Sequence, residues 1–96
     1  MLMKLFDASE AQEFGKSLAE TFSAKCPIIE SKKDVVKRAK LLSNMILDAK
    51  QFGQTHSLNV YKKAKLGNAF KWILLEKGYD AKFADELTKE IILALK

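Results

Sequence analysis

The sequence predicts an all-α protein, a compact single-domain bundle of four helices. Of its 96 residues, 48% are apolar and only one is proline, so the chain has the side chains for a core and few helix breakers. Apolar residues recur at intervals of three and four, and strict apolar–polar alternation over several residues is absent. These recurrences place the helices at about 8–25, 32–52, 58–77 and 81–95, within one domain spanning residues 1–96.

The first helix follows a capping-box pattern and stops at a proline. Asp7 or Ser9 is expected to start it, with Glu10 placed to bond back to the backbone. Pro27 ends it, because the proline ring removes an amide donor and disfavours helical geometry at Cys26. The narrow apolar stripe contains small residues that let a neighbouring helix approach. The stripe comprises Ala8, Ala11, Phe14, Gly15, Leu18, Ala19 and Phe22.

The second helix opens with Ser31 and Asp34 as a capping box and is expected to stop at Gly53. It is amphipathic, with one face in the core and the other in water. The predicted core face comprises Val35, Val36, Ala39, Leu42, Met45, Ile46, Ala49 and Phe52. The predicted water-facing stripe is wholly polar and comprises Lys33, Lys37, Lys40, Asn44, Asp48 and Gln51.

A polar loop at 54–57 separates the second helix from the third, and Thr55 or Ser57 in this loop can cap the third helix. Between Leu66 and Leu75 the third helix is almost entirely apolar, which is more apolar surface than one core contact uses. Its Gly67, like Gly15 in the first helix, is expected to be a small packing residue.

The fourth helix follows a short connection whose residues each have a helix-ending or helix-starting role. Gly78 allows the left-handed exit from the third helix, Tyr79 packs over the junction, and Asp80 caps the fourth helix. The short connection makes the third and fourth helices neighbours in space. The apolar face of the fourth helix comprises Phe83, Ala84, Leu87, Ile91, Ala94 and Leu95.

The composition excludes several kinds of chemistry. With one Cys and one His, a single chain cannot form a disulfide framework, a Cys/His zinc site or a paired-histidine metal site. The glycines are too far apart for a phosphate-binding loop. We expect His56 to be a solvent-exposed loop residue and Cys26 a buried, inert thiol, so the chain is predicted to have no catalytic apparatus, cofactor or metal.

The sequence also favours a cytoplasmic protein without a membrane segment. The residues after Met1 do not form a secretory signal, and the longest apolar runs fall far short of the ~20 residues that span a bilayer. The free thiol is typical of a reducing compartment.

The first of two functional hypotheses is a protein-interaction or homodimerisation module. Tyr61, Trp72 and Leu75 share the more polar side of the third helix, and Lys65 and Asn68 lie beside them. Tyrosine and tryptophan are enriched at interfaces, so a second copy or a partner protein can cover this patch. The alternative is that the third helix is central and its own chain buries it on two sides.

The second hypothesis is nucleic-acid binding of low sequence specificity. Residues 27–78 carry a net charge of +7, whereas the rest of the chain carries −2. Such a basic cluster suits phosphate contacts, although a single arginine offers little base-specific recognition. The alternative is a lysine-rich face in contact with water alone. The candidate residues are Lys32, Lys33, Lys37, Arg38, Lys40, Lys62, Lys63 and Lys71.

Overall fold

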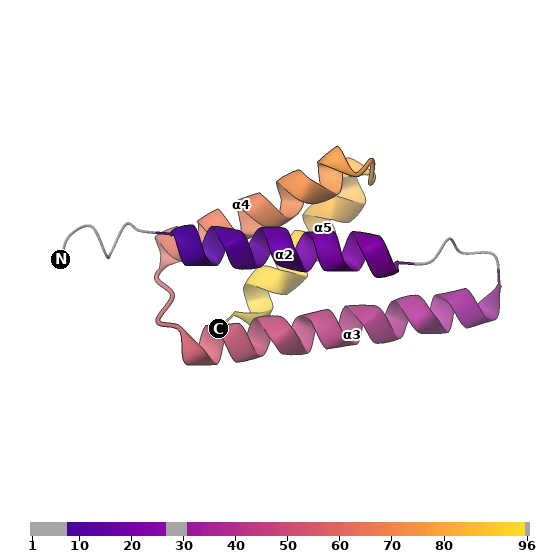
Figure 1. Ribbon diagram of the computed structural model, residues 1–96, viewed down its shortest axis with the longest axis horizontal. Helices are drawn as coiled ribbons and strands as arrows, with labels where there is room; N and C mark the ends of the chain where they lie inside the picture. The colour runs from indigo at the N-terminus through magenta and orange to yellow at the C-terminus, as the bar shows by residue number, and fades with distance from the viewer. Residues whose placement is uncertain (1–7, 27–30, 96) are drawn as a thin grey trace.

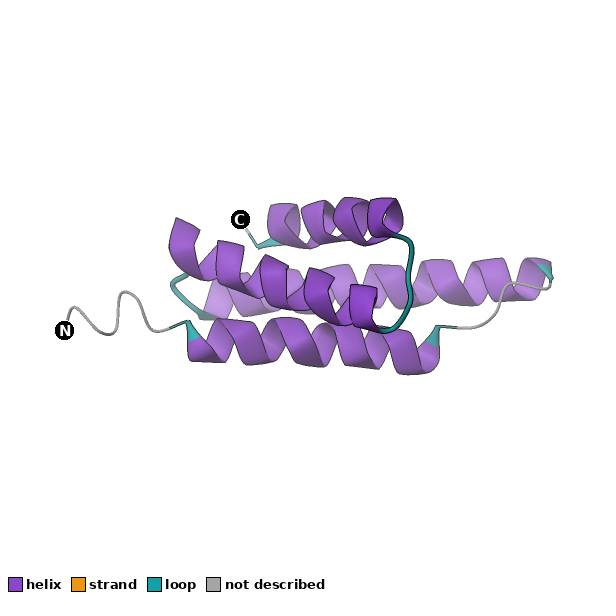
Figure 2. Ribbon diagram, turned by 90° about the horizontal axis from the view of Figure 1, so that it is seen from above, coloured by secondary structure: helices purple, strands orange, loops and turns teal. Residues whose placement is uncertain are grey.

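The computed structural model describes residues 8–26 and 31–95. Within these ranges the secondary structure is all helix, and no strand is present (Figure 2). The helices are α2 (Ser9–Lys25), α3 (Lys32–Thr55), α4 (Val60–Glu76) and α5 (Ala81–Ala94) (Figure 1). The predicted all-α bundle is therefore confirmed. Each boundary lies within three residues of its expected place.

The most extensive helix contact joins α2 to α4, although all of α3 separates them in sequence. The small residues of α2 explain this contact. Ala19 is fully buried, and a Cβ atom added to Gly15 would overlap the backbone carbonyl of Leu66. Phe70 and Leu74 of α4 are also fully buried in the core. The predicted packing role of Gly15 is therefore confirmed.

α3 is the least buried helix, and its sequence-based description needs two corrections. Gly53 does not end it: the helix continues to Thr55, and Gly53 instead lies against the backbone of Leu95. Val35 and Val36, expected in the core, are 54% and 65% exposed. Ala39 is exposed as well, so the N-terminal half of the predicted core face contributes little to the core.

The exposed half of α3 has a simple geometric origin. Figures 1 and 2 show the N-terminal turns of α3 extending past the ends of the other helices. Arg38 lies opposite the start of α5, with its Cζ atom 4.6 Å from the centre of the Phe83 ring. At the other end of α3, Gly53 faces Leu95. α5 is inclined to α3 in Figure 1 and contacts it between Arg38 and Gly53, so the turns of α3 before Arg38 extend past it.

Helix caps fix the ends of three elements. At α3, the Ser31 amide donates to Asp34 Oδ2 at 3.1 Å, which confirms the predicted capping box. At α5, Asp80 accepts from two backbone amides, and Gly78 has the predicted left-handed conformation at φ 91°. The predicted cap of α4 was wrong, because Asn59, not Thr55 or Ser57, accepts from the amide of Lys62.

α2 begins at Ser9 and ends at Lys25, and the next residue, Cys26, has an extended conformation. Asp7, the other predicted start of this helix, and Pro27, its predicted stop, lie outside the described residues. Among residues 8–26 and 31–95, none of the helices combines the length and the apolar content needed to cross a membrane.

Candidate functional site

The main candidate site is a groove of about 500 Å³ between the outer sides of α2 and α4. α4 provides most of its surface and α2 provides one edge. The groove, called the Trp72 groove below, is lined by Gln12, Lys16, Lys65, Asn68, Ala69, Lys71, Trp72 and Leu75. A site of this volume is within the range that ligands and peptide segments use.

Trp72 is the most exposed aromatic residue in the described part of the chain, with 66% of its surface accessible. α4 turns Leu66, Phe70 and Leu74 into the core, and Trp72 falls on the opposite side of the same helix. The alternative in which the chain buries α4 on two sides therefore does not hold at Trp72. Leu75, one turn away, is half-buried and gives the groove a second apolar side chain.

Three of the eight lining residues are lysines, and none is a carboxylate. The Lys71 ammonium lies 3.3 Å from Asp85 of α5, outside the groove lining. Asp85 is shared with Lys89, at 3.2 Å. Hydrogen bonds from Lys89 and Lys71 hold the pKa of the Asp85 carboxyl below its usual value. Lys16 and Lys65 stand on opposite edges of the groove, one on each helix.

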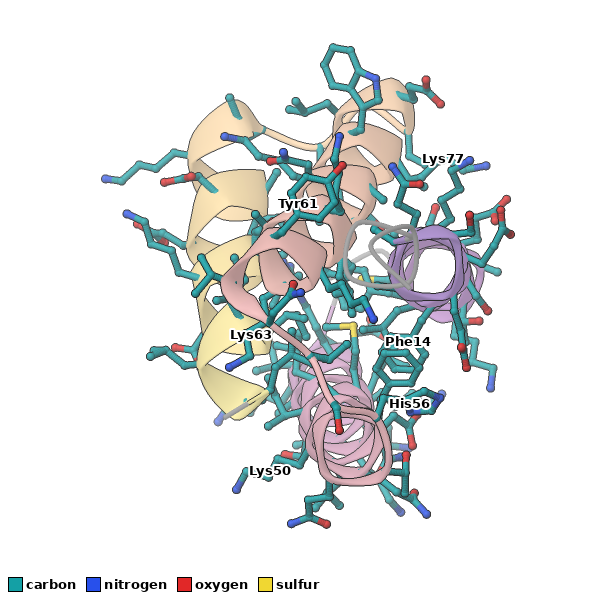
Figure 3. The ribbon with its side chains drawn as sticks, turned by 90° about the vertical axis from the view of Figure 1, so that its left-hand side faces the viewer. Phe14, Lys50, His56, Tyr61, Lys63 and Lys77 are labelled. Carbon is teal, nitrogen blue, oxygen red and sulfur yellow. The ribbon has the colours of Figure 1, made fainter. Side chains whose placement is uncertain are left out.

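The structure brings together four of the five residues proposed as a protein interface: Lys65, Asn68, Trp72 and Leu75. The fifth, Tyr61, is 41% exposed near the start of α4 and does not line the groove. Its ring lies below Lys65, whose Nζ atom is 5.4 Å from the ring centre. The view along the bundle in Figure 3 shows Tyr61 on the upper side of α4, away from α3.

Sequence reasoning missed the α2 edge of the groove. Gln12 and Lys16 are one helical turn apart and lie on either side of Gly15, where the backbone of α4 comes close to α2. Their spacing showed that they share a face of α2. Only the pairing of α2 with α4, however, places that face beside Trp72.

The basic residues proposed for nucleic-acid binding do not form one surface. Lys32, Lys33, Lys37 and Lys40 are exposed on α3, whereas Arg38 packs over the Phe83 ring. Lys62 and Lys63 are half-buried in the first turn of α4, and Lys71 pairs with Asp85. The 24 residues of α3 span ~36 Å. The first turn of α4 lies at the opposite end of the molecule from the start of α3 (Figure 1).

His56 is not the solvent-exposed loop residue that the sequence predicted, because it joins the end of α3 to the start of α2. Its Nε2–H donates to Glu10 Oε1 at 2.6 Å, and the ring stacks on Phe52 with centres 3.9 Å apart. Phe52 in turn stacks on Phe14 at 4.0 Å. Figure 3 shows Phe14 and His56 pointing toward each other between the two helices.

The Thr55 hydroxyl lies 2.9 Å from His56 Nδ1, so a hydroxyl, an imidazole and the Glu10 carboxylate are connected. This arrangement is poorly suited to nucleophilic catalysis. The single proton of the Thr55 hydroxyl is donated to the carbonyl of Gln51 at 3.0 Å, and His56 Nδ1 lies 3.0 Å from the carbonyl of Phe52. The site lies at a helix C-terminus, where carbonyl oxygens would repel a developing oxyanion instead of stabilising it.

Cys26 is half-buried, less buried than expected, and it packs against the edge of the core. Its neighbour Tyr79 contacts the rings of Phe22 and Phe83, with centres 5.8 and 5.6 Å apart. Burial, and next the Cys26 thiol, raise the pKa of the Tyr79 hydroxyl. This cluster closes the end of the core near the Gly78 turn.

Within residues 8–26 and 31–95, no group of three or more His, Cys, Asp or Glu side chains is arranged to hold a metal ion. The comparisons with known proteins do not identify a family. No family model matches the chain, and no curated protein or solved structure matches it significantly. The candidate site therefore rests on its own geometry.

Proposed function

We propose that this chain is a non-catalytic protein-interaction module that binds an acidic amphipathic helix of a partner protein in the Trp72 groove. The observation that carries the proposal is an exposed tryptophan beside a groove edged by lysines. Trp72 is 66% exposed and lies at a groove of about 500 Å³ whose lining contains three lysines and no carboxylate.

The apolar part of the groove supports a protein partner. A tryptophan buries a large area while few of its bonds lose rotational freedom, which is why it dominates many interfaces. Leu75 and Ala69 provide apolar surface beside Trp72, and Asn68 provides an amide for hydrogen bonding. An amphipathic helix recognised in a groove uses apolar side chains spaced three and four apart.

The lysines around the groove favour a partner with acidic residues. Lys16 on α2 and Lys65 on α4 stand on the two edges of the groove, with Lys71 beside them. Acidic residues flanking the partner's apolar stripe would face these lysines, while a basic helix would be repelled. A second copy docked groove to groove would bring two sets of lysines together. Charge therefore favours a different protein over a symmetric homodimer.

The test compares two synthetic amphipathic peptides of about 18 residues, or five helical turns. They share one leucine stripe and differ only in carrying glutamate or lysine beside it. Because Trp72 is the only tryptophan, its fluorescence reports occupation of the groove. We expect the acidic peptide to shift Trp72 emission to the blue and to bind at least roughly tenfold tighter than the basic peptide.

Charge reversal at the groove provides the matched control. Lys16→Glu with Lys65→Glu should invert the preference between the peptides, whereas Lys25→Glu with Lys82→Glu, at exposed positions elsewhere, should preserve it. Equal affinity for both peptides, or binding of neither, would contradict the proposal. So would a homodimer in light scattering that Trp72→Glu dissociates, because the occupant would then be a second copy.

A further inference from the structure

We propose that the outer face of α3 binds the phosphate backbone of a nucleic-acid duplex, independently of the Trp72 groove. This face is exposed and contains four lysines. It comprises Lys32, Lys33, Val36, Lys40, Ser43, Leu47, Lys50 and Gln54, all of them exposed.

The spacing of the side chains defines a continuous stripe. Residues on one side of the helix follow one another at intervals of three and four, namely Lys32, Val36, Lys40, Ser43, Leu47 and Lys50. The side opposite this stripe contains Met45 and Ala49, the two buried residues of α3. The stripe therefore points away from the bundle. Figure 3 shows Lys50 directed to the outside of α3.

The carboxylates of α3 lie off this face. Asp34 accepts from the Ser31 amide in the capping box. Asp48 lines the clefts between α3 and α2, and Lys37 lines one of them together with Asp48. Among the described residues, the outer face therefore contains four lysines and no carboxylate.

The helix end adds to this positive field. Lys32 and Lys33 are in the first turn of α3, where the helix dipole is already positive and a cation is mildly unfavourable. The same turns extend past the other helices, so a large partner can reach them without meeting the rest of the bundle (Figures 1 and 2). Asp34 supplies one negative charge in the same turn, and a bound phosphate would add a second.

The dimensions suit a duplex. Lys32 and Lys50 are separated by 18 residues, or ~27 Å along a helix. About 27 Å of duplex axis carries roughly 16 phosphates, so several lie within reach of a rigid row of lysines. Lysine contacts phosphate as a point charge and reads no base pattern, and the one arginine of the chain, Arg38, packs on Phe83 instead. Binding should therefore be independent of sequence.

Two other anionic partners fit this face less well. A membrane-surface helix needs a broad apolar face, and here only Val36 and Leu47 interrupt the polar residues. A protein interface needs an anchor such as tryptophan, tyrosine or arginine, and the face has none. Both alternatives become outcomes of the experiment.

The experiment measures binding of the full chain to a fluorescent DNA duplex of about 20 base pairs at about 50 mM and 200 mM salt. With about four phosphates neutralised, affinity should fall roughly 150-fold between these salt concentrations. Lys40→Gln with Lys50→Gln should weaken binding roughly tenfold at the lower salt concentration and make the slope of log affinity against log salt shallower by about two.

Lys77→Gln with Lys82→Gln is the matched control, because it removes the same charge at exposed positions off α3. It should weaken binding less than about threefold, and circular dichroism checks that both variants fold. Absence of duplex binding at about 50 mM salt, or an equal loss in both pairs, would overturn the proposal. Tighter binding to phosphatidylserine vesicles or to polyglutamate than to the duplex would also overturn it. Trp72→Ala should leave duplex binding unchanged, which separates this proposal from the Trp72 groove.

Discussion

His56 makes a contact that the sequence alone does not indicate. Its partner Glu10 is 46 positions away, so no local pattern indicates that the two side chains meet. The end assigned to the second helix at Gly53 also placed His56 in a free loop. The helix in fact continues to Thr55, and this directs the imidazole toward α2.

Replacing His56 tests this connection. His56→Ala removes the stacked ring and its hydrogen bond to Glu10, so we expect a loss of about 1–2 kcal/mol in the free energy of unfolding. Urea denaturation followed by circular dichroism measures it. Glu13→Ala, an exposed change one turn along α2, should cost less than about 0.5 kcal/mol. Equal stabilities of the two variants would show that His56 does not hold α2 to α3.

Part of the candidate groove could be predicted from the spacing of residues within one helix. Lys65, Asn68, Trp72 and Leu75 are spaced three and four apart on one helix, so their common face follows from helix geometry. Lys16 belongs to another helix, and its place depends on how two helices pair. Within-helix neighbours can be predicted from spacing, whereas neighbours across helices need the tertiary structure.

Among the sequence features of the helices, the small residues were the most informative about how the helices pack. Gly15 and Ala19 predicted a close approach, and the α2–α4 contact confirms it. The apolar stripe of α3 was less informative. Amphipathic spacing says which side of a helix is apolar, but it does not say how far along that side the neighbouring helices extend.

Substitution at Gly15 separates helix propensity from packing. Alanine in place of glycine normally stabilises a helix by roughly 0.5–1 kcal/mol. Here the added methyl group would overlap the Leu66 carbonyl, so we expect Gly15→Ala to lower the free energy of unfolding by about 1–2 kcal/mol. Ser17→Ala, at an exposed position on the same helix, should be neutral or slightly stabilising. Chemical denaturation of both variants provides the measurement. A Gly15→Ala protein as stable as the wild type would contradict the close approach.

For the whole molecule, burial is uneven along its 52 Å length. α2, α4 and α5 have most of the fully buried side chains, while α3 has two buried residues in 24. Stability should therefore differ between parts of the bundle, since elements with little buried surface open at a lower free-energy cost.

Hydrogen exchange can measure this difference. We expect the amides from Val36 to Lys40 to exchange orders of magnitude faster than those from Leu66 to Leu74, because the first turns of α3 open without disturbing the core. Exchange rates read by nuclear magnetic resonance provide the comparison. Equal protection in the two segments would show that α3 unfolds only with the whole bundle.

The folded molecule also distributes its positive charge differently from what the charge count along the sequence suggested. The excess positive charge does lie in the middle of the sequence, but folding distributes it over separate places. Among the described residues, the outer face of α3 contains lysines and no carboxylate, whereas Lys71 is paired with Asp85. Counting charge along the chain located the basic half, and only the helix packing could divide it into surfaces.

The dominance of the α2–α4 contact also bears on how this chain assembles. These helices are separated in sequence by all of α3, so their docking must close a long loop before the packing at Gly15 is gained. α4 and α5 instead meet across the short turn at Gly78. Loop closure of this kind slows folding relative to a bundle in which only consecutive helices pair. The α3–α5 contact, which joins Gly53 to Leu95, closes a loop of similar length, so both pairings add to this cost.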